Sequence, residues 1–533
     1  SATTTYRTLA MVRTSQLVQG NAARVASIPA PVGGWNARDS IANMEPLDAV
    51  ELINFFPTVS NCVLRGGSTN WATGMTGQVQ SLMVYSGGTS NKMFAAVGTP
   101  DLKFYDVTTA GAATATSVTG LTNAIWESIN IATTGGNYMY AVNGSDKPRL
   151  YDGTTWTAID GSSTPAITGV TTTTLSNVTL FKNRLWFIQK DTLKAWYLPT
   201  SSIGGAAQVL DLSAIAKFGG HLVDLDTWTI DAGYGVDDNL VFATSNGEII
   251  VYRGTDPASD ATWALAGVWK MGSPIGTRAM LKWAGDLLIL TYDGLMPMAQ
   301  SLQSSRLDPR VALSNKIQGA ITQATTNYGG DHAAVGWQVY YNAKRNAVWI
   351  NVPIAEGQQE QYVMNTITTS WCQFQSWPAN CWETLNDNPY YGGDGVVVRA
   401  WDDTYSDGTA NISTNVFQAF NYFDSRGVKK YFTRARPSIF TNGAPAIFVG
   451  MNVDFDVEDT AVSISLSSSA VGLWDAGTWD SASWGSGLQI TNNWQGITGL
   501  GYCGSIQLKS ASSGMQIEWA STDVVYQAGW AGI

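Results

Sequence analysis

The middle of the chain repeats one unit, a pair of strand-forming segments joined by a turn. The steps between successive copies are 45, 47, 55, 47, 61 and 42 residues. This period is close to the ~40–50 residues of one β-propeller blade, and the residues between copies suffice for a second hairpin. We therefore predict an all-β fold, with a β-propeller of six or seven blades over residues 61–412. The copies begin near Met93, Tyr138, Leu185, Leu240, Leu287, Val348 and Tyr390.

The turn residues support this reading. Asn246-Gly247 and Asp293-Gly294 supply the positive φ that two-residue hairpin turns require. Helical solenoids are excluded because apolar residues at i, i+3, i+4 and i+7 are nearly absent. A series of β-sandwiches with regular turns remains an alternative explanation of the same spacing.

The flanking regions differ from the repeats. Prolines within Ile28–Trp35 force an extended chain, so residues 1–60 are predicted to be an N-terminal extended arm, with room for one short helix in Met44–Leu52. After Ile412 the strand-forming segments become longer. Residues 413–533 are therefore predicted to form a separate C-terminal β-sandwich-like domain, or two smaller ones.

Composition limits the classes of function. The chain has 533 residues, which exceeds one ordinary core. Its 30 Lys and Arg against 41 Asp and Glu give a net charge of −11, which argues against sequence-independent nucleic-acid binding. Charged residues are only 13%, about half the usual ~25%, so the surface must be rich in neutral polar groups or covered by partners.

No targeting feature stands out in the sequence. The four cysteines are too few for a disulfide framework. No window reaches the ~18 uninterrupted apolar residues of a membrane span, and the N-terminus lacks a secretory apolar segment. We expect a soluble protein made in the cytosol.

Common enzyme signatures are missing. The chain contains no G-x-x-x-x-G-K-[ST], H-E-x-x-H or G-x-S-x-G, which lowers the expectation of an enzyme. Gly499–Gly504 matches G-x-G-x-x-G, but the residues that follow alternate like a strand, so a turn in a β domain is favoured. We predict no catalytic residue and no cofactor.

Candidate metal ligands are weak. Asp224 and Asp226 would lie on one face of a strand and His221 on the other, which favours a polar loop. His332 has no second histidine to act with. Trp401–Gly408 resembles a calcium loop, but Tyr405 stands where an oxygen ligand is required. We therefore predict no metal site.

One tryptophan-rich segment offers a possible sugar site. Residues 474–485, WDAGTWDSASWG, resemble the Asp-box turns of sialidase propellers, yet they lie outside the repeats. A structural aromatic turn is therefore favoured over a sugar site.

One short stretch is strongly basic. On a strand, Lys430, Phe432, Arg434 and Arg436 would share a face. Contact with DNA is conceivable, but a cationic edge that blocks stray strand pairing or meets an acidic neighbour is favoured. The five cations of this possible DNA or partner contact are Arg426, Lys429, Lys430, Arg434 and Arg436.

Several segments together carry a family resemblance. They are Pro29–Asp39, then Met44–Pro57 running into Val63–Gly67, and the tracts WDAGTWDSASWG and WQGITGLGY. In order and spacing these resemble the tail nozzle proteins of short-tailed bacteriophages (podoviruses), also called tail tubular protein B or phage stabilisation proteins. The motifs are structural, so the resemblance assigns no site residues.

The resemblance implies a structural virion protein. Members of this family form a ring of subunits, here a homohexamer, below the portal and adaptor, and carry a β-propeller. The resemblance further implies that the ring retains packaged double-stranded DNA and conducts it during ejection, that it contacts tail fibres or spikes, and that it is assembled in the host bacterial cytoplasm.

A second class of function stays open from the residues alone. A propeller or sandwich rich in Trp and Tyr could stack on sugars. The alternative prediction is therefore a carbohydrate-binding adhesin or polysaccharide depolymerase.

Overall fold

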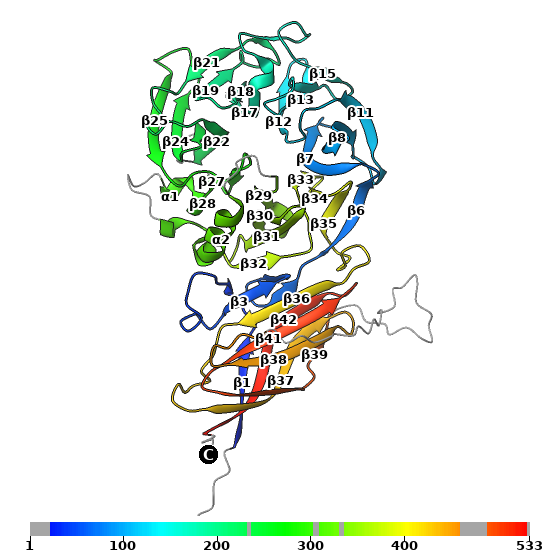
Figure 1. Ribbon diagram of the computed structural model, residues 1–533, viewed down its shortest axis with the longest axis vertical. Coiled ribbons are helices and arrows are strands. Elements are labelled where there is room, and N and C mark those ends of the chain that lie inside the picture. Colours follow the sequence, from blue (N-terminus) through cyan, green and yellow to red (C-terminus); the bar gives the residue numbers. More distant parts are fainter. Residues whose placement is uncertain (1–21, 232–235, 302–308, 330–334, 459–487, 530–533) are drawn as a thin grey trace, which may run out of the picture.

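The computed structural model describes residues 22–231, 236–301, 309–329, 335–458 and 488–529. In this part of the chain strands dominate, and the α-helices are α1 (Met298–Ser301) and α2 (Gln318–Tyr328). Figure 1 shows a β-propeller joined to a smaller β domain below it. The predicted all-β propeller fold is confirmed.

Six sheets of three to five strands belong wholly to the described part of the propeller and follow one another around a common axis (Figure 1). The strands of the first three are β7 (Gly77–Ser86), β8 (Asn91–Pro100), β9 (Lys103–Asp106) and β11 (Thr114–Thr119); β12 (Glu127–Thr133), β13 (Gly136–Val142), β14 (Arg149–Tyr151) and β15 (Trp156–Ala158); and β17 (Leu175–Phe181), β18 (Arg184–Gln189), β19 (Lys194–Tyr197) and β21 (Gln208–Asp211).

The next two sheets contain β22 (Leu222–Asp231), β23 (Val236–Thr244), β24 (Glu248–Gly254) and β25 (Trp263–Lys270), then β26 (Met280–Trp283), β27 (Asp286–Thr291) and β28 (Gly294–Pro297). The sixth contains β33 (Cys381–Leu385), β34 (Asn388–Gly392), β35 (Val397–Asp402), β6 (Gly67–Thr73) and β10 (Gly111–Ala112). Between the fifth and the sixth, the circle is completed by β29 (Gln338–Asn342), β30 (Ala347–Ala355), β31 (Gln358–Asn365) and β32 (Trp371–Phe374), which belong to a nine-stranded sheet. A two-stranded sheet pairs β16 (Ile167–Thr168) with β20 (Gly205–Ala206).

The sequence repeat corresponds to these sheets. Every copy begins in or at the second strand of its own strand group, so the repeated hairpin is formed by the second and third strands. The strands concerned are β8, β13, β18, β23, β27, β30 and β34.

The two ends of the propeller segment close the circle together. β6, which precedes the first repeat, pairs antiparallel with β35, which follows the last hairpin, with Asn70 opposite Val398. The first and last strands of the propeller therefore lie in one sheet, which ties the circle shut.

Apolar clusters between neighbouring sheets hold the propeller together. One such cluster joins Met83 and Phe94 of one sheet to Trp126 and Met139 of the next, and all four side chains are buried. Alternating apolar residues on each strand thus pack against the adjacent sheet as well as within their own.

The smaller domain is a two-layer β structure. One layer contains β39 (Gln489–Thr491), β40 (Gln495–Gly501), β37 (Lys430–Thr441), β42 (Ile517–Ala528), β1 (Ala23–Pro29), β5 (Cys62–Leu64) and β4 (Phe55–Pro57). The other is the remainder of the nine-stranded sheet, with β2 (Gly34–Trp35), β3 (Asp48–Ile53), β36 (Ile412–Gln418), β41 (Gly504–Ser512) and β38 (Ala446–Val453).

The described part of the N-terminal region, from residue 22 on, is extended, and it pairs into the second domain instead of forming a separate arm. β1 pairs with β42 along its whole length. The short helix considered for Met44–Leu52 is wrong, because Asp48–Ile53 is strand β3, which pairs antiparallel with β36 and touches β32 of the propeller. Pairing on both edges outweighs the weak local helix tendency. Through β3, one sheet continues from the propeller into the second domain.

A buried arginine fixes this junction. Arg65, fully buried, donates to both carboxylate oxygens of Asp407, at 3.0 and 2.6 Å, and to Asn54 Oδ1 at 2.9 Å. Its guanidinium also lies 4.3 Å from the ring of Trp377.

A glycine allows close packing at the same junction. Gly34, at φ +84°, lies so close to β32 that a Cβ there would come within 2.6 Å of the Trp371 carbonyl oxygen.

Candidate functional site at the propeller axis

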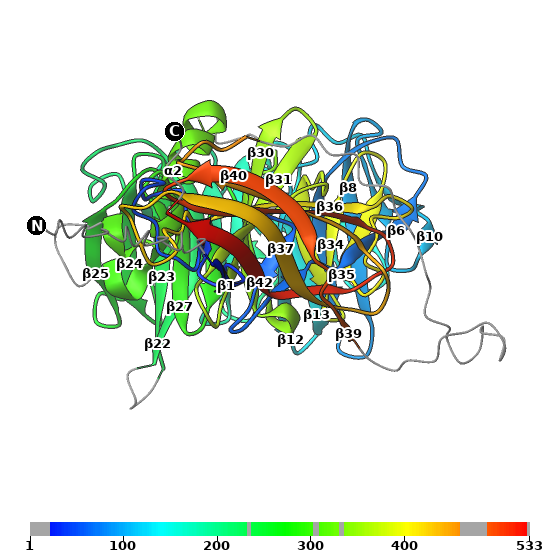
Figure 2. The ribbon, with the colours of Figure 1, turned by 90° about the horizontal axis from the view of Figure 1, so that it is seen from below.

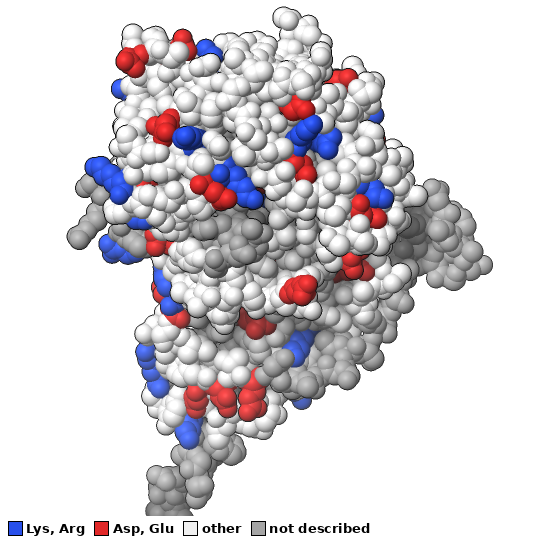
Figure 3. Space-filling model, turned by 45° about the horizontal axis from the view of Figure 1, so that its top comes forward, with Lys and Arg blue, Asp and Glu red and all other residues white. Residues whose placement is uncertain are grey.

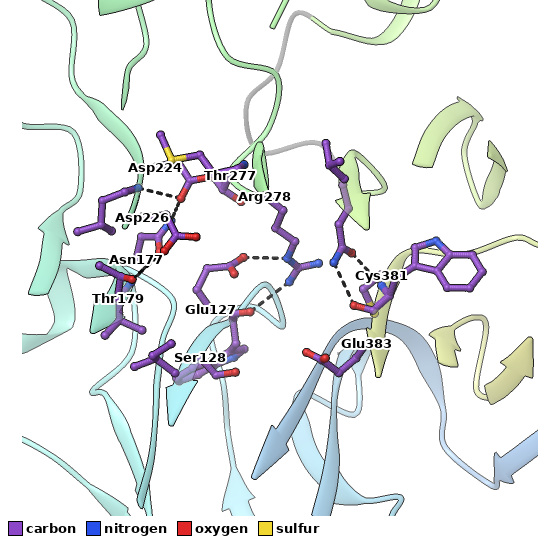
Figure 4. A pocket seen from close by; sticks show the side chains of 18 of the residues that line it. Glu127, Ser128, Asn177, Thr179, Asp224, Asp226, Thr277, Arg278, Cys381 and Glu383 are labelled. Carbon is purple, nitrogen blue, oxygen red and sulfur yellow. Dashed lines mark hydrogen bonds and ion pairs between the residues drawn. The ribbon is translucent and has the colours of Figure 1, made fainter. Parts of the chain in front are cut away.

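A polar cavity of about 230 Å³ lies at the axis of the propeller. Its wall is built from the first strands of the successive strand groups, and each of these strands contributes one to three lining residues (Figure 4). These strands are β7, β12, β17, β22, β26, β29 and β33. Because these strands surround one cavity, charged and amide groups from distant parts of the sequence lie close together.

Arg278 is the central basic group. It precedes β26, and its Nε donates to Glu127 Oε1 at 2.8 Å. Its two other nitrogens donate to the carbonyls of Gln80 and Trp126 and to the hydroxyl of Ser81. One guanidinium therefore links β26, β7 and β12, using the planar set of donors that only arginine offers.

Asp224 makes the corresponding links on the other side of the cavity. Its carboxylate accepts from Asn177 Nδ2 at 2.8 Å and from the backbone N–H groups of Leu225, Ala279 and Met280. Burial, together with the neighbouring Glu127, raises the pKa of Asp224 well above its ordinary value despite these donors. Asp224 thus connects β17, β22 and β26.

A second carboxylate on β22 lies nearer the solvent. Asp226 forms an ion pair with Lys282 at 2.7 Å and accepts from Thr179 Oγ1 at 3.2 Å. Thr179, Asp226 and Lys282 thus connect β17, β22 and β26 a second time, two residues further along each strand.

The last part of the wall joins β29 to β33. Gln338 donates to the Trp382 carbonyl at 3.0 Å and accepts from the Trp382 N–H at 2.8 Å. Glu383 accepts from the Thr384 N–H at 2.8 Å, and burial raises the pKa of Glu383 to about 7. Burial also raises the pKa of Glu127, although Arg278 opposes this effect.

These contacts make the axis a belt of bonds between neighbouring strand groups. The principal carboxylates and Arg278 are already engaged with neighbouring strands. At about 30 Å³ per molecule, the cavity holds about eight waters. A cavity of this volume has no room for a DNA duplex, whose two grooves are ~12 and ~6 Å wide and each about 8 Å deep.

The candidate metal ligands do not converge. In the described residues no group of three His, Cys, Asp or Glu side chains is placed to hold a metal ion. His221 lines a neighbouring cavity with Lys190 and Asp191, while Asp224 and Asp226 face the axis. His332 and residues 474–485 lie outside the described residues.

In the calcium-like loop Trp401–Gly408, the carboxylates of Asp402 and Asp407 bind side chains and backbone groups of the same chain. Asp402 accepts from Thr69 Oγ1 at 2.6 Å and from Thr404, and Asp407 pairs with Arg65. The G-x-G-x-x-G match runs from β40 to the start of β41, so it is a connection within a β domain, as predicted. No helix in the described part of the chain is long and apolar enough to cross a membrane.

The five cations predicted to contact DNA or a partner have different environments in the structure. Lys430 is buried and donates to the carbonyls of Val428 and Tyr502. Arg436 pairs with Asp523 at 2.6 Å, whereas Arg434 is exposed. The expectation that Lys430, Phe432, Arg434 and Arg436 share a face is wrong.

The reason is a shift of register between Phe432 and Arg434 in the pairing of β37. This bulge turns Lys430 and Phe432 inward and Arg434 and Arg436 outward. The two remaining cations lie before β37 against aromatic rings, Arg426 at 4.4 Å from that of Tyr422 and Lys429 at 5.6 Å from that of Tyr502.

Sequence reasoning missed the axis belt. Its members stand in or just before the strand that precedes six of the seven repeated hairpins, at residues 127, 177, 224, 278, 338 and 383. A polar residue recurring there with the period of the repeat was the signal that could have revealed it.

Comparisons with known proteins give structural neighbours only. No protein-family model matches the chain, and no curated protein matches it. Among solved structures, YCF48 bound to D1 peptide is 12% identical, over 63% of this chain and 95% of that one, with a TM-score of 0.37. The β-propeller domain of Cps50 (Swd1) from Myceliophteria thermophila is 12% identical over 63% and 99%, with a TM-score of 0.39. BBS1N in complex with ARL6DN is 10% identical over 64% and 97%, also at 0.39.

Proposed function

We propose that this chain is a structural virion protein, a tail nozzle subunit of a short-tailed bacteriophage. Six copies form a ring below the portal and adaptor, contact tail fibres or spikes, retain the packaged DNA and conduct it during ejection. The protein is assembled in the host bacterial cytoplasm and acts in the virion, and it is not an enzyme.

The observation that carries the proposal is where the two N-terminal resembling segments lie. Pro29–Asp39 and Met44–Gly67 run through β2 to β6, between the propeller and the second domain. Their polar residues are engaged there: Asn36 donates to Asp48 at 2.7 Å, and Arg65 holds Asp407. The family-like residues thus build a rigid joint, which suits a subunit that must keep its shape while DNA is driven past it.

The small size of the axis cavity bears on where the DNA would pass. Because the cavity in one propeller holds only about eight waters, the lumen in this proposal lies between copies. A net charge of −11 suits such a lumen, since a basic lining would bind phosphates and slow their transit. Most of the surface in Figure 3 is uncharged, as fits a subunit with flanks covered by neighbours.

The carbohydrate-binding alternative has less support. Most described tryptophans are buried, and Trp494 is the only one of them that is exposed. An extended stacking platform for sugars is therefore not formed by the tryptophans of the described residues.

The direct test is electron microscopy of the purified chain, alone and with the phage adaptor. A six-fold ring that joins the adaptor is expected, and the Arg65→Met variant, which leaves Asp407 unpaired at the joint, should lower ring yield at least tenfold. The exposed substitution Lys194→Met is the control. A wild-type chain that stays monomeric with the adaptor and is absent from virions would contradict the proposal, and saturable glycan binding would then favour the alternative.

A further inference from the structure

The seven-stranded sheet of the second domain has one face on the core and one at the surface. Its outer face lies across the end of the molecule away from the propeller, where β37, β40 and β42 are seen from outside in Figure 2. No other strand or helix of the described residues is seen over this face in that view. We call it the outer sheet face, formed by the outward side chains of β1, β37, β39, β40 and β42.

The two arginines on this face, Arg434 and Arg436, differ in whether they form an ion pair. Val25, Val525 and Arg434 stand opposite one another on β1, β42 and β37, and opposed residues share a face. Two residues further along β37, Arg436 lies opposite Asp523 and forms an ion pair with it. The guanidinium of Arg436 also lies 4.7 Å from the ring of Trp494. Arg434 forms no ion pair with any described residue.

The same face exposes large apolar side chains. The exposed fractions of Val25, Ile490, Trp494 and Leu500 are 63%, 58%, 42% and 41%. At ~3.3 Å per residue, the twelve residues of β37 span about 40 Å, and the paired strands add about 15–20 Å of width. The face, roughly 700 Å² in the plane of the sheet, is therefore large enough to receive a short segment of another chain.

An acidic segment of the same chain complements this face. Asp454, Asp456 and Glu458 follow β38 and are exposed, and Val457 between them is 37% exposed. We call this segment the acidic tip. Copies with a net charge of −11 repel one another unless a contact pairs cations with acids.

We propose that the outer sheet face binds the acidic tip of a second copy of this chain, an inference that rests on the proposed function. The tip's carboxylates neutralise Arg434 and also Lys429, which directly precedes β37 and lies against Tyr502 at the end of β40. Val457 packs against Trp494, beside Arg436. The ring of the proposed function requires that each copy offers its face to one neighbour and its tip to another, so the contact is heterologous.

Exchanging the charges of the outer sheet face and the acidic tip tests whether the two surfaces bind each other. The face variant is Lys429→Glu with Arg434→Glu, and the tip variant is Asp456→Lys with Glu458→Lys. Sedimentation velocity of the full chain at low salt should show at least a tenfold loss of self-association for each variant alone. The combined variant, which exchanges the two charges, and an equimolar mixture of the two variants should both recover association to within about threefold.

Matched controls carry the same charge changes on exposed positions elsewhere. They are Lys194→Glu with Lys217→Glu, and Glu45→Lys with Glu356→Lys, and both should associate like the wild type. Unchanged association of the face and tip variants would overturn the inference, as would a wild type that is monomeric at every concentration. Loss of duplex-DNA binding by the face variant without loss of association would also overturn it.

The two proposals fail in different ways. If virion images show rings of the chain but the charge variants assemble normally, the inferred contact is wrong and the nozzle function stands. If the chain self-associates through this contact but never joins a virion, the nozzle function is wrong.

Discussion

The propeller axis and the outer sheet face both carry charged side chains, but these differ in burial and in whether they have partners within the chain. At the axis, Arg278, Glu127 and Asp224 are enclosed and engaged with neighbouring strands. On the outer sheet face, Arg434 is exposed and has no ionic partner among the described residues. An engaged buried charge holds a fold together, whereas an unpaired exposed one is available to another molecule.

The largest expected effect tests the axis. Arg278→Met removes the only cation of the buried pair and leaves Glu127 uncompensated, so we expect a loss of about 2–4 kcal/mol in the free energy of unfolding. Chemical denaturation followed by tryptophan fluorescence measures it. The double variant Arg278→Met with Glu127→Gln should recover part of the loss, and a single variant as stable as the wild type would mean that the axis charges do not hold the sheets.

A smaller effect concerns pH. Burial raises the pKa of Glu383 to about 7, so the folded state favours the protonated carboxyl. The associated stability is complete below the ordinary pKa near ~4.3 and is lost as pH rises through about 7.

Replacing the carboxyl should remove that dependence. Because Glu383 keeps partial solvent contact, we expect Glu383→Gln to be more stable than the wild type by about 1–2 kcal/mol at pH 8 and equally stable at pH 4. Parallel urea denaturation at the two values measures this difference. Glu356→Gln, in an exposed turn, is the control, and equal stability of Glu383→Gln and wild type at pH 8 would contradict the burial argument.

The smallest effect tests the outer sheet face. Arg434→Glu changes an exposed side chain without an ion partner, so the free energy of unfolding should change by less than ~0.5 kcal/mol. Thermal denaturation provides the measurement, with Lys194→Glu as the reference. A loss above 1 kcal/mol would show that Arg434 stabilises the fold, and the contrast with Arg278 would disappear.

Local patterns predicted the repeated part of the fold. Turn residues such as Asn246-Gly247 and alternating apolar residues are local signals, and they placed a hairpin in every propeller sheet. Pairing partners distant in sequence were not predictable in this way. The pairing of β1 with β42, of β3 with β36 and of β6 with β35 depends on the completed fold. The same limit explains the wrong helix in Met44–Leu52.

The axis was hidden for a related reason. Arg278 and Glu127 are 151 residues apart, and neither belongs to a recognisable motif. In the basic stretch, strict strand alternation grouped Arg434 with Lys430, and the bulge after Phe432 separated them. A bulge of one residue has no strong sequence signal here, yet it decides which cations reach the surface.

Our central proposal is that copies of this chain enclose a lumen between them, while the small cavity at each propeller axis carries no DNA. A three-dimensional reconstruction of the tail by electron cryomicroscopy tests it most directly. We predict a ring in which the outer sheet face of each copy meets its neighbour and DNA density lies on the ring axis. DNA density along a propeller axis, or a tail without this chain, would contradict the account.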